Sequence, residues 1–224
     1  MKHLIIGIVI AASALCSLSV SADNYKQASF RDGKWEATFQ LGYSGDDFIQ
    51  SGDESSLKID SDLGWGVSLG YNINSNFLVN FELASFTPKY EATFALDKEP
   101  KETETINHKL NMVTTHFNAV YNITKGRLAP YLQVGAGWTY IDSNIANGPP
   151  IGGCWWDPWW GYICDGFQPT HTDTNYSYNY GVGVRYELAN NMLLKASYGM
   201  VVTNMDHSED MEVDVFKIEI GSVF

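Results

Sequence analysis

The chain has 224 residues, with 26 acidic residues against 14 Lys and Arg and a formal net charge of −12. This excess of acid argues against binding of nucleic acid, or of an anionic lipid surface, through a basic patch. The length is sufficient for a single all-β domain.

The first 22 residues predict a secretory signal peptide. They combine a basic start at Lys2, an apolar run from Leu4, and a Val20-Ser21-Ala22 triplet that suits signal peptidase. The run is shorter than the roughly 20 apolar residues that a membrane-spanning helix needs. Cys16 raises a lipoprotein alternative, although Leu15 stands where a small residue is expected. We therefore expect a signal peptide at 1–22 and one domain at 23–224, the latter with 13 basic and 26 acidic residues and two cysteines.

Eight segments alternate apolar and polar residues, which is the period-two pattern of a β-strand. In chain order they are 34–43, 63–73, 77–83, 111–123, 130–141, 176–188, 192–202 and 216–221. Short turns alternate with long polar connections at 44–62, 95–105, 142–175 and 204–210. Short turns on one side and long loops on the other are typical of a transmembrane β-barrel, for which eight strands is a common small size. The predicted fold is an all-β, eight-stranded antiparallel up-and-down transmembrane β-barrel with short periplasmic turns and long extracellular loops.

A soluble β-sandwich is the alternative, because its strands alternate as well. Aromatic residues near both ends of a strand, such as Trp35 and Tyr43 or Tyr178 and Tyr186, match the two interfacial belts of a membrane barrel. The opposite face of the strands is rich in Gly, Ser, Asn and charged residues, which a barrel encloses. Both features favour the barrel.

Three runs carry a family resemblance: SSLKIDSDLGWGVSLGYNINSNFLVNFELA, APYLQVGAGWTY and YGVGVRYELANNMLLKASY. They resemble the small eight-stranded outer membrane proteins of Gram-negative bacteria, most closely the outer membrane protein W family and more loosely OmpA-type barrels. The resemblance implies a location in the cell outer membrane, with outer membrane lipids and lipopolysaccharide as neighbours. It also implies a narrow barrel that binds small apolar molecules or lets them escape sideways into the membrane.

The C-terminal strand is similar to the signal by which the barrel assembly machinery recognises such chains. Its alternating apolar residues end in an aromatic one: Phe216, Ile218, Ile220 and Phe224. Ser222 departs from the apolar or aromatic residue expected at its position. We expect the assembly machinery to be a partner of the chain.

The lower half of the predicted lumen collects charges of both signs. An eight-stranded barrel is only wide enough for side chains to fill it, and an unpaired buried charge is costly. We therefore expect a structural plug formed by Glu36, Glu82, His116, Arg185, Glu187, Lys195, Lys217 and Glu219.

The upper half of the lumen is predicted to be an apolar cup. Its expected members are Ala84, Phe86, Leu110, Met112, Ile141, Val201 and Val215. An apolar cup above a charged plug suits a binder of small apolar molecules. Ordinary hydrophobic packing in the part of the barrel above the membrane explains the same pattern equally well, and a bulge would turn some of these positions outward.

The connection 142–175 contains the run CWWDPWWGYIC. Cys154 and Cys164, in an exported chain, predict a disulfide worth roughly 2–3 kcal/mol. Asp157-Pro158 and Gly161 supply turn chemistry for a hairpin. This loop is a departure from the common pattern of both families. Its aromatic residues could cover the cup as a lid, rest on the outer leaflet, contact a partner or pack against one another; they are Trp155, Trp156, Trp159, Trp160 and Tyr162.

Catalysis is not expected. The candidates are His171 with Asp173, and His207 with Asp206 and Ser208. A nucleophilic site needs a hydroxyl, an imidazole and a carboxylate within hydrogen-bond reach, which neighbours in one loop rarely achieve.

We expect no cofactor and no metal, since the chain has neither zinc-ligand spacing nor an EF-hand. The acidic connection 204–210 could nevertheless hold a divalent cation that bridges lipopolysaccharide phosphates.

The sequence thus predicts a non-enzymatic outer membrane β-barrel that binds or passes small apolar molecules through its outer half. The alternative is a structural or adhesive surface protein whose disulfide-closed aromatic loop contacts a partner or lipopolysaccharide.

Overall fold

The computed structural model describes residues 30–51, 55–95, 103–147, 151–159, 161–167, 169–188, 191–205 and 210–224. The predicted signal peptide, with Cys16, lies outside the described residues. Asp206, His207, Ser208 and Glu209 also lie outside them.

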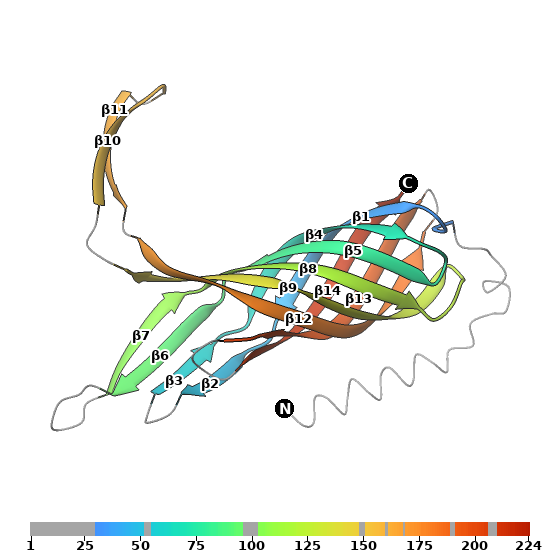
Figure 1. The fold of residues 1–224 in the computed structure, drawn as a ribbon, viewed down its shortest axis with the longest axis horizontal. Helices are drawn as coiled ribbons and strands as arrows, with labels where there is room; N and C mark the ends of the chain where they lie inside the picture. The colour runs from blue at the N-terminus through green and yellow to red at the C-terminus, as the bar shows by residue number, and fades with distance from the viewer. Residues whose placement is uncertain are drawn as a thin grey trace.

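Eight strands close into a barrel. They are β1 (Trp35–Ser44), β4 (Asp62–Asn72), β5 (Phe77–Phe86), β8 (Asn111–Asn122), β9 (Leu128–Ala146), β12 (Thr170–Glu187), β13 (Met192–Thr203) and β14 (Met211–Val223). Each pairs antiparallel with the next barrel strand along the chain, and β14 pairs with β1 to close the cylinder (Figure 1). The predicted eight-stranded up-and-down barrel is confirmed.

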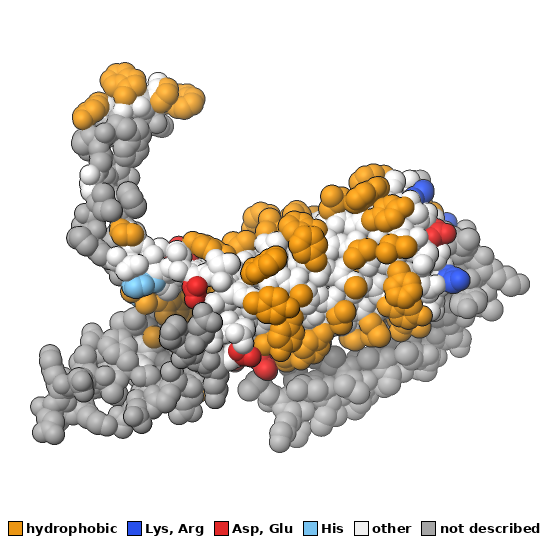
Figure 2. Space-filling model, in the orientation of Figure 1, with side chains coloured by type: hydrophobic (Ala, Val, Ile, Leu, Met, Phe, Trp, Pro, Cys, Tyr) orange, Lys and Arg blue, Asp and Glu red, His pale blue; other side chains and the backbone are white. Residues whose placement is uncertain are grey.

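The alternation of residues decides which side chains enter the lumen. In β1, Glu36, Thr38 and Gln40 are buried inside, whereas Phe39 and Leu41 are exposed outside. The same division in the other strands covers the outer wall with apolar side chains (Figure 2). The barrel therefore has an apolar exterior, which suits a lipid surround. Its interior is polar along these positions of β1.

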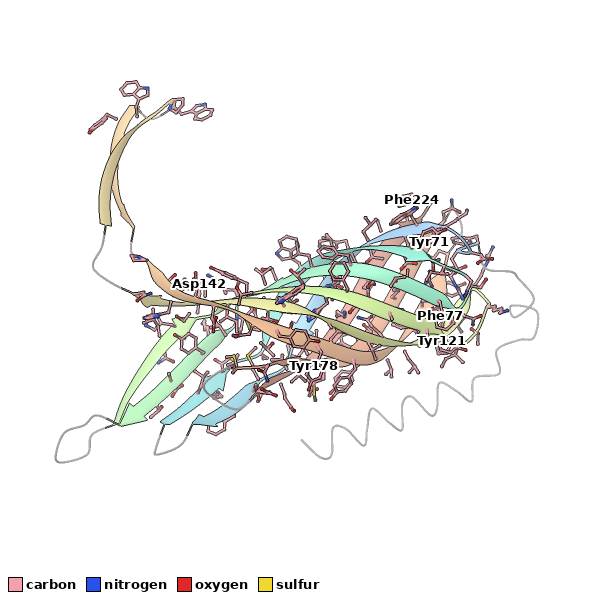
Figure 3. All side chains as sticks on the ribbon, in the orientation of Figure 1. Tyr71, Phe77, Tyr121, Asp142, Tyr178 and Phe224 are labelled. Carbon is pink, nitrogen blue, oxygen red and sulfur yellow. The ribbon has the colours of Figure 1, made fainter. Side chains whose placement is uncertain are left out.

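Aromatic pairs reinforce the outer wall between neighbouring strands. The rings of Phe77 and Tyr121, which are register partners on β5 and β8, have centroids 5.0 Å apart. Trp35 and Tyr71 pair in the same way across β1 and β4, at 5.2 Å. Figure 3 shows Tyr71, Phe77 and Tyr121 on the outside of the wall. Within the described part of the chain, no helix is long and apolar enough to cross a membrane.

Glycine at 137 allows two barrel strands to approach closely. A Cβ atom at Gly137 of β9 would lie 1.9 Å from the carbonyl oxygen of Thr115 in β8. No side chain fits at that distance, so glycine is required by the contact between the two strands.

Six further strands lie in or next to the connections that were predicted as long loops. A four-stranded sheet has the order β2-β3-β6-β7, and β10 and β11 form a separate hairpin. Their bounds are β2 (Asp47–Ser51), β3 (Ser55–Ile59), β6 (Lys89–Ala95), β7 (Thr103–Lys109), β10 (Ile151–Asp157) and β11 (Gly161–Phe167). The hairpin predicted around Cys154 and Cys164 is β10–β11. The four-stranded sheet was not predicted from the sequence, because its strands are short. The central pair, β3 with β6, also joins two different connections, which no local pattern reveals.

Both additions leave the barrel at its long-loop end, opposite the C-terminus (Figure 1). The four-stranded sheet continues outward from β1, β4, β5 and β8, whereas the hairpin leaves the extended ends of β9 and β12 and turns away from the barrel. The hairpin does not lie over the mouth of the barrel, so it is not a lid in this structure.

Candidate functional site

The first half of the charged lumen network is centred on Glu36 of β1. Its carboxylate accepts hydrogen bonds from Arg185 Nη2 at 3.0 Å, from Lys195 Nζ, and from Asn72 Nδ2 at 3.2 Å. Lys195 Nζ also lies 3.6 Å from Glu219 Oε2. Four barrel strands, β1, β12, β13 and β14, are thus joined through buried ion pairs.

The second half is centred on Glu82 of β5. Its oxygens accept from Lys217 Nζ at 2.8 and 3.0 Å, Gln40 Nε2 at 3.0 Å and Asn118 Nδ2 at 3.1 Å. His116, the register partner of Glu82, meets Ser177 Oγ through Nε2 at 2.9 Å. The residues predicted for the lower lumen are therefore brought together, and each carboxylate among them has a cationic partner. That this network closes the lumen as a structural plug stays a prediction.

Arg31 completes this network, although no sequence pattern indicated it. It precedes β1, at the short-turn end of the barrel, and its side chain is buried. Nη1 donates to Glu187 Oε1 at 2.6 Å and to the carbonyl oxygen of Gly126 at 3.2 Å. Nε and Nη2 donate to the carbonyl oxygens of Ser75 and Thr124 at 2.6–2.9 Å. The residue thereby links two short turns and the end of β12. A lone arginine outside any strand carries no periodic signal, which is why the sequence did not reveal it.

The predicted cup residues also lie together at the long-loop end of the lumen. Ala84, Phe86, Leu110, Met112, Ile141 and Val215 belong to one buried cluster, and Val201 packs against it. The cluster continues into the four-stranded sheet through Leu57, Ile59, Tyr90 and Ala92. The cup is therefore part of a hydrophobic core shared by the barrel and the sheet.

Little space remains inside the cup. The ring of Phe86 fills a slot over two glycines: a Cβ at Gly64 would lie 2.3 Å from Phe86 Cδ1, and one at Gly42 would lie 2.9 Å from its Cζ. Two cavities of about 40 and 20 Å³ adjoin Phe86, Val201 and Val215. By comparison, an apolar cavity that holds benzene measures about 150 Å³. A small apolar molecule must therefore displace side chains to enter.

Tyr90 fixes the sheet to the outer part of β9. Its buried hydroxyl donates to the carbonyl oxygen of Ser143 at 3.0 Å, and burial raises the pKa of Tyr90. The sheet is consequently docked on the barrel by both apolar packing and a hydrogen bond.

The aromatic run forms the β10–β11 hairpin, and its large side chains are highly exposed. Trp156 and Tyr162 are register partners, and Trp159 lies in the turn. The exposed fractions of Trp156, Trp159 and Tyr162 are 74, 84 and 68 %. Figure 2 shows these apolar side chains gathered at the hairpin tip. The side chains of Trp155 and Trp160 lie outside the described part of the structure.

The same hairpin register pairs Cys154 with Cys164. Their side chains lie outside the described part, so the disulfide stays a prediction. Gly161 has φ +76°, the left-handed conformation that glycine tolerates best in a turn.

The candidate catalytic pair is not assembled. The carboxylate of Asp173 accepts from the backbone N–H of Thr174 at 2.8 Å and from Asn175 Nδ2 at 3.3 Å. No contact between Asp173 and His171 is found. Among the described residues, no three His, Cys, Asp or Glu side chains gather as metal ligands.

The residues of the predicted assembly signal all lie on the outer wall. Phe216, Ile218, Ile220 and Phe224 are exposed there. The backbone of Phe224 exchanges hydrogen bonds of 2.9 and 3.0 Å with that of Trp35, so the chain end completes the barrel seam. Recognition of these residues by the assembly machinery stays a prediction.

Comparison with solved structures shows a likeness to small outer membrane barrels. Neisserial surface protein A (NspA) is 14 % identical, with a TM-score of 0.53 over 84 % of this chain and 95 % of its own. The outer membrane protein OprG from Pseudomonas aeruginosa is 14 % identical, with a TM-score of 0.51 over 87 % of this chain and 97 % of its own. Ail, the attachment invasion locus protein of Yersinia pestis, is 16 % identical, with a TM-score of 0.46 over 85 % and 99 %. At such identities the likeness shows the fold alone.

Sequence comparison identifies the family of the chain but not a subfamily within it. No curated protein sequence matches the chain, and the resemblance to the outer membrane protein W family stays a prediction. The family model described as "Outer membrane protein beta-barrel domain" matches residues 10–224. The chain therefore belongs to the outer membrane β-barrel protein family and is located in the outer membrane.

Proposed function

We propose that this protein is a non-enzymatic surface-interaction protein, in which the barrel is an anchor and the β10–β11 hairpin contacts a macromolecular partner. The observation that carries this proposal is the exposure of Trp156, Trp159 and Tyr162 at the hairpin tip. Export would use the predicted signal peptide and the C-terminal strand, with 23–224 forming one domain.

The tip aromatics differ in their surroundings from the aromatics of the barrel wall. Wall residues such as Trp65 and Tyr180 face the lipid, which covers their apolar surface. The tip lies beyond the ends of the barrel strands (Figure 1). Trp and Tyr combine large apolar area with a hydrogen-bonding group and are enriched at the energetic centres of interfaces. A partner that covers them removes apolar surface from water.

The architecture of the hairpin supports the same role. In the described residues, β10 and β11 pair only with each other, and an isolated two-stranded hairpin is marginally stable in water. Contact with a partner would therefore both bury the tip and stabilise the hairpin.

Adhesion of intact bacteria tests this proposal. Cells that display the wild-type protein would be compared with cells that display the triple variant Trp156→Ser, Trp159→Ser and Tyr162→Ser. Attachment to layers of purified extracellular matrix proteins and clumping of the cells themselves would be measured at equal surface amounts. We expect the variant to lose attachment or clumping several-fold.

Phe48→Ser is a matched control, because Phe48 is also exposed but lies on β2 of the four-stranded sheet. It should attach like the wild type. Equal attachment and clumping by the wild type and the triple variant would refute the role of the tip.

Binding of small apolar molecules in the cup is the second candidate function. It is favoured by the two cavities beside Phe86, which give a ligand a point of entry once that ring turns away. Ala84→Trp would fill this space, whereas Ala84→Ser would keep it. Saturable binding of naphthalene to the refolded barrel, measured by calorimetry, should be abolished by the first change and kept by the second. Binding that survives Ala84→Trp in a folded barrel would place the ligand elsewhere.

A further inference from the structure

A groove lined by polar and charged residues lies where the four-stranded sheet joins the barrel. Its volume is about 710 Å³, within the range of about 300–1,000 Å³ for small-molecule sites. The lining includes Thr87, Lys89, His108, Lys109, Asn111 and Asn144, and none of the lining side chains is apolar. Asp142, labelled in Figure 3, marks the junction, since it is the register partner of Asn111. The groove is separate from both the cup and the hairpin tip.

Two lysines stand directly opposite each other in this groove. Lys89 on β6 and Lys109 on β7 are register partners, which puts their Cβ atoms about 4.5–5.5 Å apart on one face of the sheet. Like charges in this position repel and destabilise the pair of strands. A bound anion would relieve that repulsion.

Few carboxylates of the described part of the protein lie near these two lysines to neutralise them. In the described residues, neither lysine forms an ion pair. Asp60 is the one carboxylate in the lining, and its Oδ1 is 3.0 Å from Nζ of Lys58. Both lysine side chains are exposed, so their ammonium groups are accessible to a ligand.

Asn144 forms a fixed wall of the groove. It has φ +54°, an uncommon conformation for a residue other than glycine. The backbone N–H of Asn144 donates to Asp142 Oδ1 at 2.9 Å, and Asn144 Nδ2 donates to the carbonyl oxygen of Lys109 at 2.7 Å. The amide of Asn111 donates to Asn144 Oδ1 at 3.4 Å. These bonds hold the strand that carries Lys109 against β9.

We propose that this groove binds a saccharide that carries a phosphate or carboxylate group. The two ammonium groups would bind the anion. Asn and Thr side chains can both donate to and accept from sugar hydroxyls. Because the whole chain is acidic, with a formal net charge of −12, an anion must gain its affinity from short-range contacts in this groove.

Such a saccharide has two sources at the cell surface: the headgroup of a glycolipid in the surrounding outer leaflet, and a free or host-borne sugar. Calorimetry on the refolded full chain would use three soluble probes: trehalose 6-phosphate, sialyllactose and deacylated lipopolysaccharide. Binding of deacylated lipopolysaccharide alone would identify the glycolipid headgroup as the source. Binding of either small saccharide would support a free sugar. Failure of all three probes to bind would overturn the proposal.

The variant Lys89→Gln with Lys109→Gln should weaken binding at least tenfold, and unphosphorylated trehalose should not bind the wild type. Lys125→Gln is the matched control, because Lys125 is exposed at the short-turn end of the barrel and lies outside the lining. It should leave the affinity within twofold, as should the hairpin-tip triple variant. Unchanged affinity in the double variant, with folding verified by heat-modifiable gel mobility, would also overturn the proposal.

Discussion

Arg31 Nη1 lies 2.6 Å from Glu187 Oε1, although the two residues are 156 positions apart in the sequence. Both side chains have an exposed fraction of 0 %. Arg185 Nη2 lies 3.8 Å from Glu187 Oε1, and the same atom forms an ion pair with Glu36. Arg31 therefore connects the chain just before β1 to the charged lumen network.

Arg31→Ala should destabilise the barrel strongly. It would leave the buried Glu187 short of a cation and three turn carbonyls short of a donor, and breaking a buried ion pair costs about 3–5 kcal/mol. The measurement is the urea midpoint of the protein refolded in micelles. Asp32→Ala, at the exposed neighbouring position, should leave the midpoint unchanged. If Arg31→Ala and Asp32→Ala unfold at the same urea concentration, the pair contributes no stability.

Gly137→Ala should interfere with the pairing of β8 and β9. The added Cβ would lie 1.9 Å from a backbone oxygen, and backbone cannot move away as a flexible side chain can. We expect a loss at or above the upper end of the range of about 1–3 kcal/mol for overpacking, seen as a lower fraction of heat-modifiable, folded protein. Gly152→Ala is the control, because a Cβ at Gly152 meets nothing within 4 Å. Normal folding of Gly137→Ala would show that the strands can separate at little cost.

Phe86→Ala should both destabilise the protein and enlarge the cup. Removal of a buried Phe ring costs about 3–5 kcal/mol, and the space created would adjoin the two existing cavities. Thermal unfolding should occur at a lower temperature, and benzene should raise that temperature for the variant but not for Phe48→Ala. No benzene effect on the variant would mean that the cup collapses around the missing ring.

Cys154 and Cys164 should form a disulfide that stabilises the hairpin and not the barrel. Register partners in an antiparallel pair have Cα atoms about 4.5–5.5 Å apart, within the range of about 4.4–6.8 Å that a disulfide spans. Mass spectrometry of the unreduced, alkylated protein should find neither cysteine modified. Cys154→Ser with Cys164→Ser should speed amide exchange in β10 and β11 and leave β12–β14 unchanged. Alkylation of both cysteines without reduction would exclude the disulfide.

The sequence by itself determined the barrel and the direction of its side chains. Strand alternation depends on neighbours two positions apart, so Glu36, Glu82 and Lys195 could be assigned to the lumen, and Phe39 and Leu41 to the wall, without knowledge of any distant contact. The pairing of charges also followed, because buried charges in so narrow a lumen need partners.

Only the tertiary structure decided what the long connections build and how the lumen is filled. The sheet β2-β3-β6-β7 depends on pairing between connections far apart in the sequence, and the repulsive Lys89–Lys109 pair exists only through that register. Phe86 fills the cup because Gly42 and Gly64 from other strands leave a slot for its ring. Arg31 meets its four partners only when the short turns converge. These features depend on close packing between distant segments, which a repeating pattern along the chain does not encode.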